Sequence, residues 1–116
     1  MTTAELKRAL QTTSEVKITV IGRGSGREIS HPVWFVQEGE DLYLLPVRGS
    51  GTEWYRNVLK TPTIRIAADG AETTAKAAAI TDPAAVNDVA EKFGAKYGEV
   101  DRYYPTRDVA VQVPLA

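Results

Sequence analysis

The sequence predicts a mainly β protein: a small antiparallel barrel of six strands with two to three short helices inserted between them. Three observations support this prediction. Short segments in which apolar and polar residues alternate are separated by glycine-rich or polar turns. Other segments show helical spacing. The 116 residues suit one domain, 1–116, and closing short strands into a barrel removes exposed sheet edges.

Six segments have the composition of strands. They lie at residues 15–23, 31–37, 42–47, 63–67, 72–80 and 108–113. The first segment is the clearest, because Val16, Ile18 and Val20 fall on one face. A glycine-rich turn at 22–27 follows the first strand and a polar loop at 38–41 follows the second. We therefore expect the first three strands to form an antiparallel meander.

Three segments are predicted to be helical. They are a lead at 3–12, a short helix at 53–60 and a longer helix at 83–97. Thr3 is the expected N-cap of the first, Pro62 limits the second, and Pro83 and Gly98 frame the third. The third helix has one apolar face, made by Val86, Val89, Ala90, Phe93 and Tyr97. The alanine run at 77–79, placed in the fifth strand, is also compatible with a helix.

The composition argues against several classes of function. A net charge of −1 gives no overall basic field, so nucleic acid is a poor candidate partner. No apolar run approaches the roughly 20 residues of a membrane-spanning helix. Without cysteine and with one histidine, the chain is expected to form no disulfide, no thiolate site and no metal site. The first residues lack the apolar core of a signal peptide, and a cytoplasmic location is the default expectation.

A strand, a glycine-rich turn and a helix start follow one another at residues 42–59. The turn contains Arg48, followed by Gly49, Ser50 and Gly51. Glycine lets the backbone approach a ligand, exposed N–H groups donate hydrogen bonds, and the helix dipole favours negative charge. Arginine can hold a phosphate with two donors. The turn is therefore a candidate phosphate site, and the alternative is a plain connection with a solvated arginine.

Several motifs in this order resemble the split β-barrel superfamily, which includes flavin-binding pyridoxamine-phosphate-oxidase-like proteins and deazaflavin-dependent nitroreductases. The motifs lie at residues 20–27, 31–36, 41–45, 48–62, 95–98 and 108–114. The most specific is the helix start with Trp54, Tyr55 and Asn57 behind a basic, glycine-rich turn. The chain is similar to a small branch of uncharacterised proteins in this superfamily, and the resemblance extends over residues 16–115. It implies a six-stranded split β-barrel.

The resemblance also implies a homodimer that binds FMN or the deazaflavin coenzyme F-420 at its subunit interface. The residues it assigns to the cofactor are Trp34, Val47, Arg48, Gly49, Ser50, Gly51, Trp54, Tyr55 and Asn57. Arg48 takes the position of the phosphate ligand, and Trp54 lies beside the ring. One arginine in a short turn suits the monophosphate of FMN better than a polyanionic tail. Tyr97, Tyr103 and Tyr104 match residues that cover the substrate in the nitroreductases, and the alternative is helix-end packing.

Three functions agree with these residues. The first is a nitroreductase- or quinone-reductase-like oxidoreductase, in which the cofactor carries the hydride chemistry. The second is a cofactor carrier or sensor without turnover, and the third is a structural homodimer without cofactor. No catalytic residue is assigned. We interpret Arg23, Ser25 and Arg27 as an exposed charged turn, and His31 as a structural or surface residue.

Overall fold

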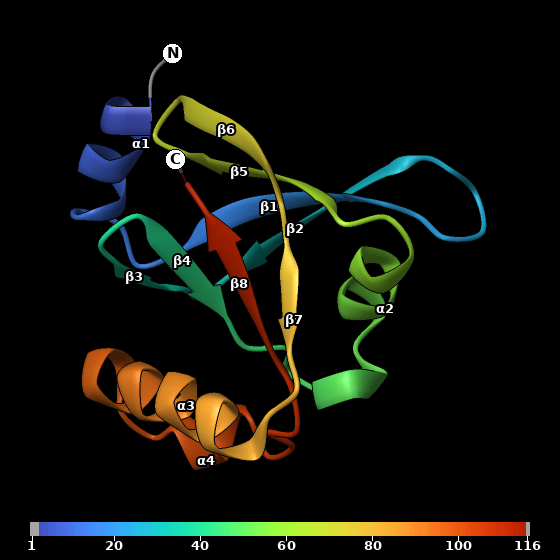
Figure 1. Ribbon diagram of the computed structural model, residues 1–116. Coiled ribbons are helices and arrows are strands. Elements are labelled where there is room, and N and C mark those ends of the chain that lie inside the picture. The colour runs from blue at the N-terminus through green and yellow to red at the C-terminus, as the bar shows by residue number, and fades with distance from the viewer. Residues whose placement is uncertain (1–2, 116) are drawn as a thin grey trace.

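The computed structural model describes residues 3–115, which form two four-stranded antiparallel sheets facing each other (Figure 1). The first sheet, in the order β2-β1-β5-β6, consists of β1 (Val16–Ile21), β2 (Glu28–Val33), β5 (Thr63–Ala68) and β6 (Ala71–Lys76). The second sheet, in the order β3-β4-β8-β7, consists of β3 (Val36–Glu38), β4 (Asp41–Leu44), β7 (Ala78–Ile80) and β8 (Ala110–Pro114). The mainly β class is confirmed. The prediction of one barrel of six strands is wrong, because the described residues form eight strands in two separate sheets that do not close into a barrel.

The predicted second strand is divided by a break at Trp34 and Phe35. The Phe35 N–H donates to the Tyr97 hydroxyl at 3.1 Å, and the Phe35 carbonyl accepts from Lys96 Nζ at 2.9 Å. These side chains, from the helix α3 (Pro83–Tyr97), take the place of ladder partners, so the chain leaves β2 and enters the other sheet as β3. The expected meander is therefore wrong, since β2 and β3 are not neighbours.

The predicted fifth strand is also divided. Its two parts, β6 and β7, belong to different sheets, and Ala77 between them donates its N–H to the Pro62 carbonyl at 2.8 Å. The helical alternative for residues 77–79 is wrong, because β7 pairs with β8. At both breaks, an outer strand of one sheet continues directly into an outer strand of the other.

The three predicted helices are present. They are α1 (Thr3–Leu10), which lies against β5 and β6, α2 (Glu53–Lys60) and α3. Asp82 caps α3 by accepting a hydrogen bond from the Ala85 N–H at 3.0 Å. The predicted N-cap role of Thr3 concerns a side chain outside the described residues. Two short elements lack a periodic signal and were not predicted, the 3₁₀ turn η1 (Gly49–Gly51) and α4 (Val100–Tyr103). Within residues 3–115, no helix has the length and apolar character needed to cross a bilayer.

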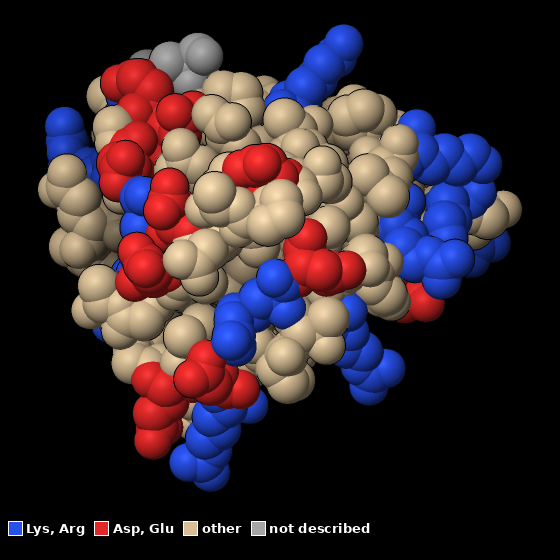
Figure 2. Space-filling model, turned by 60° about the horizontal axis from the view of Figure 1, so that its bottom comes forward, with Lys and Arg blue, Asp and Glu red and all other residues tan. Residues whose placement is uncertain are grey.

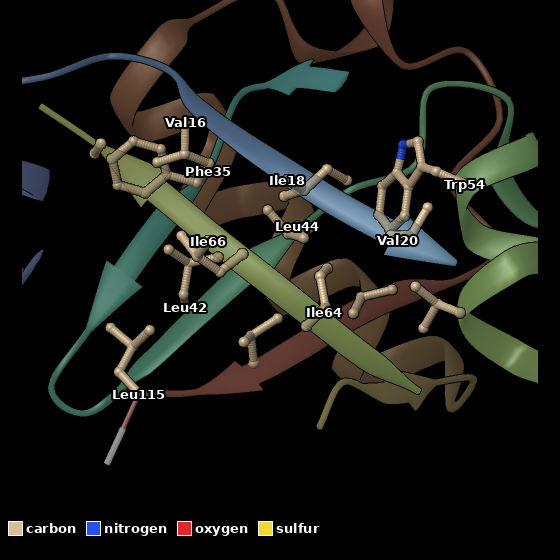
Figure 3. Packing of buried hydrophobic residues seen from close by; sticks show 14 of the residues in the cluster. Val16, Ile18, Val20, Phe35, Leu42, Leu44, Trp54, Ile64, Ile66 and Leu115 are labelled. Atoms are coloured by element: carbon tan, nitrogen blue, oxygen red, sulfur yellow. The ribbon is translucent and has the colours of Figure 1, made fainter. Parts of the chain in front are cut away.

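Two hydrophobic cores hold the layers together. The main core lies between the sheets, where β1 points Val16, Ile18 and Val20 inward and α2 contributes Trp54 (Figure 3). The second core includes Phe93 of α3 and lies between that helix and the sheet that contains β4. The second sheet is thus covered on both faces, while α2 closes one end of the molecule (Figure 1).

Candidate functional site

A pocket of about 270 Å³ lies between the end of β2, the segment after β4, α2 and α4. Its lining contains four aromatic rings, four other apolar residues and one carboxylate: Glu15, Pro32, Val33, Trp34, Leu45, Val47, Trp54, Tyr103 and Tyr104. Small-molecule pockets typically measure roughly 300–1,000 Å³ and are mostly apolar. This pocket is slightly smaller than that range and suits a single ring system.

Five residues that the resemblance assigned to the cofactor or the substrate meet in this pocket. They are Trp34, Val47, Trp54, Tyr103 and Tyr104. The other predicted residues lie outside the lining, in the turn 48–51, behind Trp34 or in the core. Glu15 was not predicted. In the β1–β2 ladder Val16 pairs with Val33, so Glu15, the residue before Val16, lies next to Trp34, the residue after Val33. This position was not predicted because the register of a hairpin with a long turn cannot be read from the sequence.

Trp34 is the centre of an aromatic cluster that forms one wall of the pocket. Its ring stacks on Tyr97, with centroids 4.3 Å apart and planes at 10°, and meets Tyr103 edge-on at 5.1 Å. The three tyrosines predicted as a lid therefore occupy different positions. Tyr97 supports Trp34, Tyr104 is buried, and Tyr103 is 44% exposed at the mouth. Burial raises the pKa of the Tyr104 hydroxyl, because desolvation disfavours the phenolate.

The Tyr97 hydroxyl joins three chain segments. It lies 2.7 Å from the Ser14 carbonyl oxygen and 2.9 Å from the Phe35 carbonyl oxygen, which share its proton, and it accepts a hydrogen bond from the Phe35 N–H. Burial raises the pKa of this hydroxyl, because desolvation disfavours the phenolate. These contacts fix the residue before Glu15 and the residue after Trp34.

Tyr97→Phe is expected to lower the free energy of unfolding by about 1–3 kcal/mol, because it leaves the Phe35 N–H without a partner and keeps the stacked ring. Urea denaturation followed by circular dichroism measures this loss. Tyr103→Phe is the control, because it removes an exposed hydroxyl and is expected to change stability by less than about 0.5 kcal/mol. Equal stability of the two variants would contradict the role given to the Tyr97 hydroxyl.

The glycine-rich turn is closed by a carboxylate from its own chain. Asp108 accepts hydrogen bonds from the Ser50 hydroxyl at 2.6 Å and from the Ser50 N–H at 3.0 Å, an arrangement we call the Ser50–Asp108 clasp. The hydrogen bond from the Ser50 hydroxyl holds the pKa of the Asp108 carboxyl below its ordinary value. The clasp therefore adds stability at neutral pH that is lost as the pH falls through this lowered pKa. The Ser50 hydroxyl and N–H, which were predicted as donors to a phosphate, thus already donate hydrogen bonds to Asp108.

Arg48 is a cation next to the pocket that has no partner in the described part of the chain. It follows the lining residue Val47, its side chain is exposed, and its guanidinium makes no hydrogen bond or ion pair with residues 3–115. Its backbone N–H donates to Thr52 Oγ1 at 2.8 Å, and the Thr52 side chain does not cap α2. An arginine and an uncapped helix N-terminus, which both favour an anion, therefore lie close together in the chain.

Two predicted cofactor residues belong to the framework. Asn57 is buried, and its Oδ1 accepts hydrogen bonds from the Arg23 backbone N–H at 3.1 Å and from Arg23 Nη1 at 2.8 Å. Arg23 also pairs with Glu53 at 2.7 Å, so the β1–β2 turn is tied to α2. Tyr55 packs in the main core. Burial raises the pKa of its hydroxyl, and the nearby charge of Asp108 contributes.

The surface charge is unevenly distributed although the net charge is −1. Figure 2 shows Lys and Arg gathered at the right-hand edge and many of the Asp and Glu side chains in the left half. The right-hand edge corresponds to the β1–β2 turn and α2 in Figure 1. The end of the molecule that carries α2 is therefore the more favourable one for an anion.

Solved structures with the same fold include proteins of different functions. An F420-H2-dependent reductase is 19% identical, with a TM-score of 0.65 over 86% of this chain and 93% of its own. A candidate pyridoxamine 5'-phosphate oxidase from Listeria innocua is 15% identical, with a TM-score of 0.70 over 96% of this chain and 90% of its own. HutZ, the heme storage protein from Vibrio cholerae, is 18% identical, with a TM-score of 0.73 over 98% of this chain and 90% of its own. At such identities the likeness concerns the fold alone.

The resemblance to the split β-barrel superfamily is thereby confirmed at the level of the fold. A comparison with curated proteins gives no match. The model of one bacterial family, described as an uncharacterized protein conserved in bacteria (DUF2255), matches residues 5–113. With nearly its whole length matched, this split-barrel chain belongs to the DUF2255 family.

Proposed function

We propose that this protein binds a flavin or deazaflavin cofactor in the aromatic pocket and acts as an oxidoreductase on a small molecule. The observation that carries the proposal is the meeting of Trp34, Val47, Trp54 and Tyr103 around one cavity. An apolar slot between aromatic rings suits a flat conjugated ring, which it holds by stacking and edge contacts. When bound, the cofactor supplies the hydride chemistry, and the protein supplies position and apolar surroundings.

Trp54 adds a directional contact to this pocket. Its indole N–H has no hydrogen-bond partner among the described residues, and no buried nitrogen or oxygen there lacks a partner. The N–H is therefore not fully buried, and we assign its accessible side to the pocket that Trp54 lines. Figure 3 shows its nitrogen on the side of the ring away from Val20 and the core. A ring carbonyl of the cofactor is the acceptor that fits this donor.

Arg48 is the residue that we assign to the cofactor phosphate. Its guanidinium can grip a phosphate with two hydrogen bonds, and the N–H groups of the first turn of α2 are close by in the chain. Ser50 receives a different role, since its donors are engaged by Asp108 and it keeps the turn in shape. One free arginine suits the monophosphate of FMN better than a polyanionic tail.

We infer that a second copy of the chain completes the site. Val47 and Tyr103 line the pocket, yet they are 50% and 44% exposed. A cavity of about 270 Å³ leaves part of a cofactor uncovered. A second copy across the mouth would bury these side chains, which adds roughly 25 cal/mol of stabilisation per Å² of apolar surface removed from water.

A carrier or sensor without turnover would use the same pocket, and enzyme assays separate it from the oxidoreductase. Storage of heme, the property of HutZ, has less support in this chain. Among the nine residues that line the pocket, only Tyr103 and Tyr104 are of a type that can bind heme iron, and His, Cys and Met are missing from the lining. The pocket, at about 270 Å³, is also small for a heme macrocycle. We therefore place the flavin-type cofactor first.

The test is a titration with FMN and with the deazaflavin coenzyme, followed by tryptophan fluorescence. Both tryptophans of the chain, Trp34 and Trp54, line the pocket, so quenching reports on this site. Saturable quenching by either cofactor supports the proposal, and reduction of a nitroaromatic or quinone by the loaded protein then separates an enzyme from a carrier. Absence of quenching by both cofactors at high micromolar concentration would overturn the proposal.

Arg48→Ala is expected to weaken FMN binding by about 10- to 100-fold, which corresponds to the roughly 1.5–3 kcal/mol of a hydrogen bond to a charged group. The same fluorescence titration measures the change. Arg56→Ala is the matched control, because it removes an exposed arginine of α2 that is not next to the pocket lining. An equal effect of the two substitutions would mean that Arg48 contributes only to the electrostatic field at this end of the molecule and does not bind the phosphate directly.

A further inference from the structure

Glu15 is the one charged residue among those that line the aromatic pocket. It stands immediately before β1, its side chain is exposed, and it is absent from the ion pairs formed among residues 3–115. The other lining residues are apolar or aromatic. The pocket therefore offers a ligand one fixed charge, and that charge is negative.

The position of Glu15 is held by the same contacts that hold Trp34. The Tyr97 hydroxyl binds the carbonyl of Ser14, directly before Glu15, and both backbone groups of Phe35, directly after Trp34. The ring of Tyr97 stacks on the Trp34 indole. The backbone next to Glu15 and the aromatic wall are thus fastened side by side before any ligand arrives, which lowers the cost of ordering this part of the site.

The aromatic wall adds to the attraction for positive charge. Trp34 and Tyr103 meet at 64° with centroids 5.1 Å apart and form a corner at the mouth of the pocket. The face of an aromatic ring carries negative potential, and an exposed Trp or Tyr ring favours a cation by about two- to fivefold in affinity. Arg102 already lies over the Tyr103 ring, 5.7 Å from its centroid, so Trp34 is the ring that supplies this attraction.

Two lysines near this corner leave the Glu15 carboxylate available. Lys17 shares a neighbouring surface hollow with Glu15 but forms no ion pair with it. Lys96 Nζ donates to the Phe35 carbonyl at 2.9 Å and lies over the Phe35 ring. Burial lowers the pKa of Lys96, and its ammonium does not pair with Glu15 within residues 3–115.

The acidic and basic ends of the site lie toward opposite ends of β1. Glu15 precedes the first residue of β1, whereas α2 is tied to the turn that follows the last residue of β1. Glu15 and Trp54 line the same pocket, and Figure 3 shows Trp54 beside Val20, near the end of β1, and Val16 at its start. The surface charge follows the same direction, with the basic end at α2 (Figure 2). A cofactor with its phosphate at Arg48 and its ring against Val47 and Trp54 would therefore leave the Glu15 corner, with Trp34 and Tyr103, for a second molecule.

We propose that the Glu15 corner binds the positive group of a flat organic cation, and that such cations are the substrate class of the site. The carboxylate neutralises the charge, and Trp34 and Tyr103 cover the ring. Protonated or N-alkylated nitrogen heterocycles and aromatic amines fit this description. The assignment as substrate rests on the proposed function, whereas the preference of the pocket for a cation does not.

The experiment compares three probes of nearly equal shape and different charge: 1-methylnicotinamide, nicotinamide and nicotinate. The ¹⁵N-labelled protein is titrated with each, and the two tryptophan indole N–H signals are followed by NMR, which measures weak binding at this pocket. The cation is expected to bind about 5- to 20-fold more tightly than the neutral amide, and the anion more weakly than both. Glu15→Gln is expected to reduce the preference for the cation to about twofold, the part that the Trp34 ring supplies.

Glu72→Gln is the matched control, since Glu72 is an exposed carboxylate on β6, outside the pocket, and it is expected to keep the full preference. Equal affinities for the three probes, tighter binding of the anion, no binding of any probe, or an unchanged preference in Glu15→Gln would each overturn the inference. If FMN binds and the probes show no charge preference, only this inference fails. If the cation binds at Glu15 and neither cofactor binds, the proposed function fails and the cation site stands.

Discussion

Gly49→Ala is expected to lower the free energy of unfolding by about 2–4 kcal/mol, through backbone strain and steric conflict together. The backbone of Gly49 has φ 58°, in the left-handed region that residues with a side chain rarely adopt. An added Cβ would stand 2.0 Å from Asp108 Oδ1 and 2.7 Å from Thr106 Cγ2. The substitution therefore breaks the Ser50–Asp108 clasp. Urea denaturation measures the loss.

Gly51→Ala is the matched control at the other end of the same turn. An added Cβ at Gly51 meets no atom within 4 Å, and the expected change is below about 0.5 kcal/mol. Similar losses for the two alanine variants would show that close approach of Asp108 does not determine the structure of this turn. A large loss confined to Gly49→Ala would support the clasp as the feature that shapes the candidate phosphate corner.

Phe35→Ala is expected to have the largest effect on stability, a loss of about 3–5 kcal/mol. Phe35 is fully buried in the main core, between the two sheets. Domains of this size have a free energy of unfolding of roughly 5–15 kcal/mol, so the variant loses a large part of the total. Calorimetry is expected to show a melting temperature lower by roughly 10–20 °C.

Leu59→Ala is the control for this prediction, because Leu59 is 55% exposed on α2 and its truncation is expected to cost less than about 0.5 kcal/mol. If Phe35→Ala does not fold, Phe35→Leu keeps most of the volume and is expected to lose about 1–1.5 kcal/mol. A loss below 1 kcal/mol for Phe35→Ala would contradict the position of this ring in the core.

The elements that the sequence predicts well are those fixed by local periodicity. The alternation of Val16, Ile18 and Val20 and the apolar face of residues 83–97 each lie within one segment, so their burial follows from spacing alone. The break at Phe35 depends on the Tyr97 hydroxyl, 62 residues away in the chain. Spacing within one segment carries no information about such a distant partner. The predicted strands 31–37 and 72–80 are therefore each two strands in the structure.

The candidate site likewise has a part that could be predicted from the sequence and a part that could not. The resemblance placed Trp34, Val47 and Trp54 around a cofactor, and these residues do line one pocket. The physics of a glycine-rich turn predicted a place for a phosphate, and that prediction stays open. It did not reveal that Asp108, 58 residues beyond Ser50, brings a negative charge from within the chain. Contacts between side chains far apart in the sequence are thus the part of the site that could not be predicted.

The two sheets meet along two seams, one from β2 to β3 and one from β6 to β7, and at each seam the backbone itself runs across. Between such outer strands there is no ladder of hydrogen bonds to break. At the β2–β3 seam the two layers are held instead by hydrogen bonds from Tyr97 and Lys96 of α3 to the Phe35 backbone. The pocket with Trp34 lies at this seam. Side chains of α3, rather than a ladder of strand hydrogen bonds, therefore hold this wall of the pocket, so a ring beside Trp34 need displace no strand.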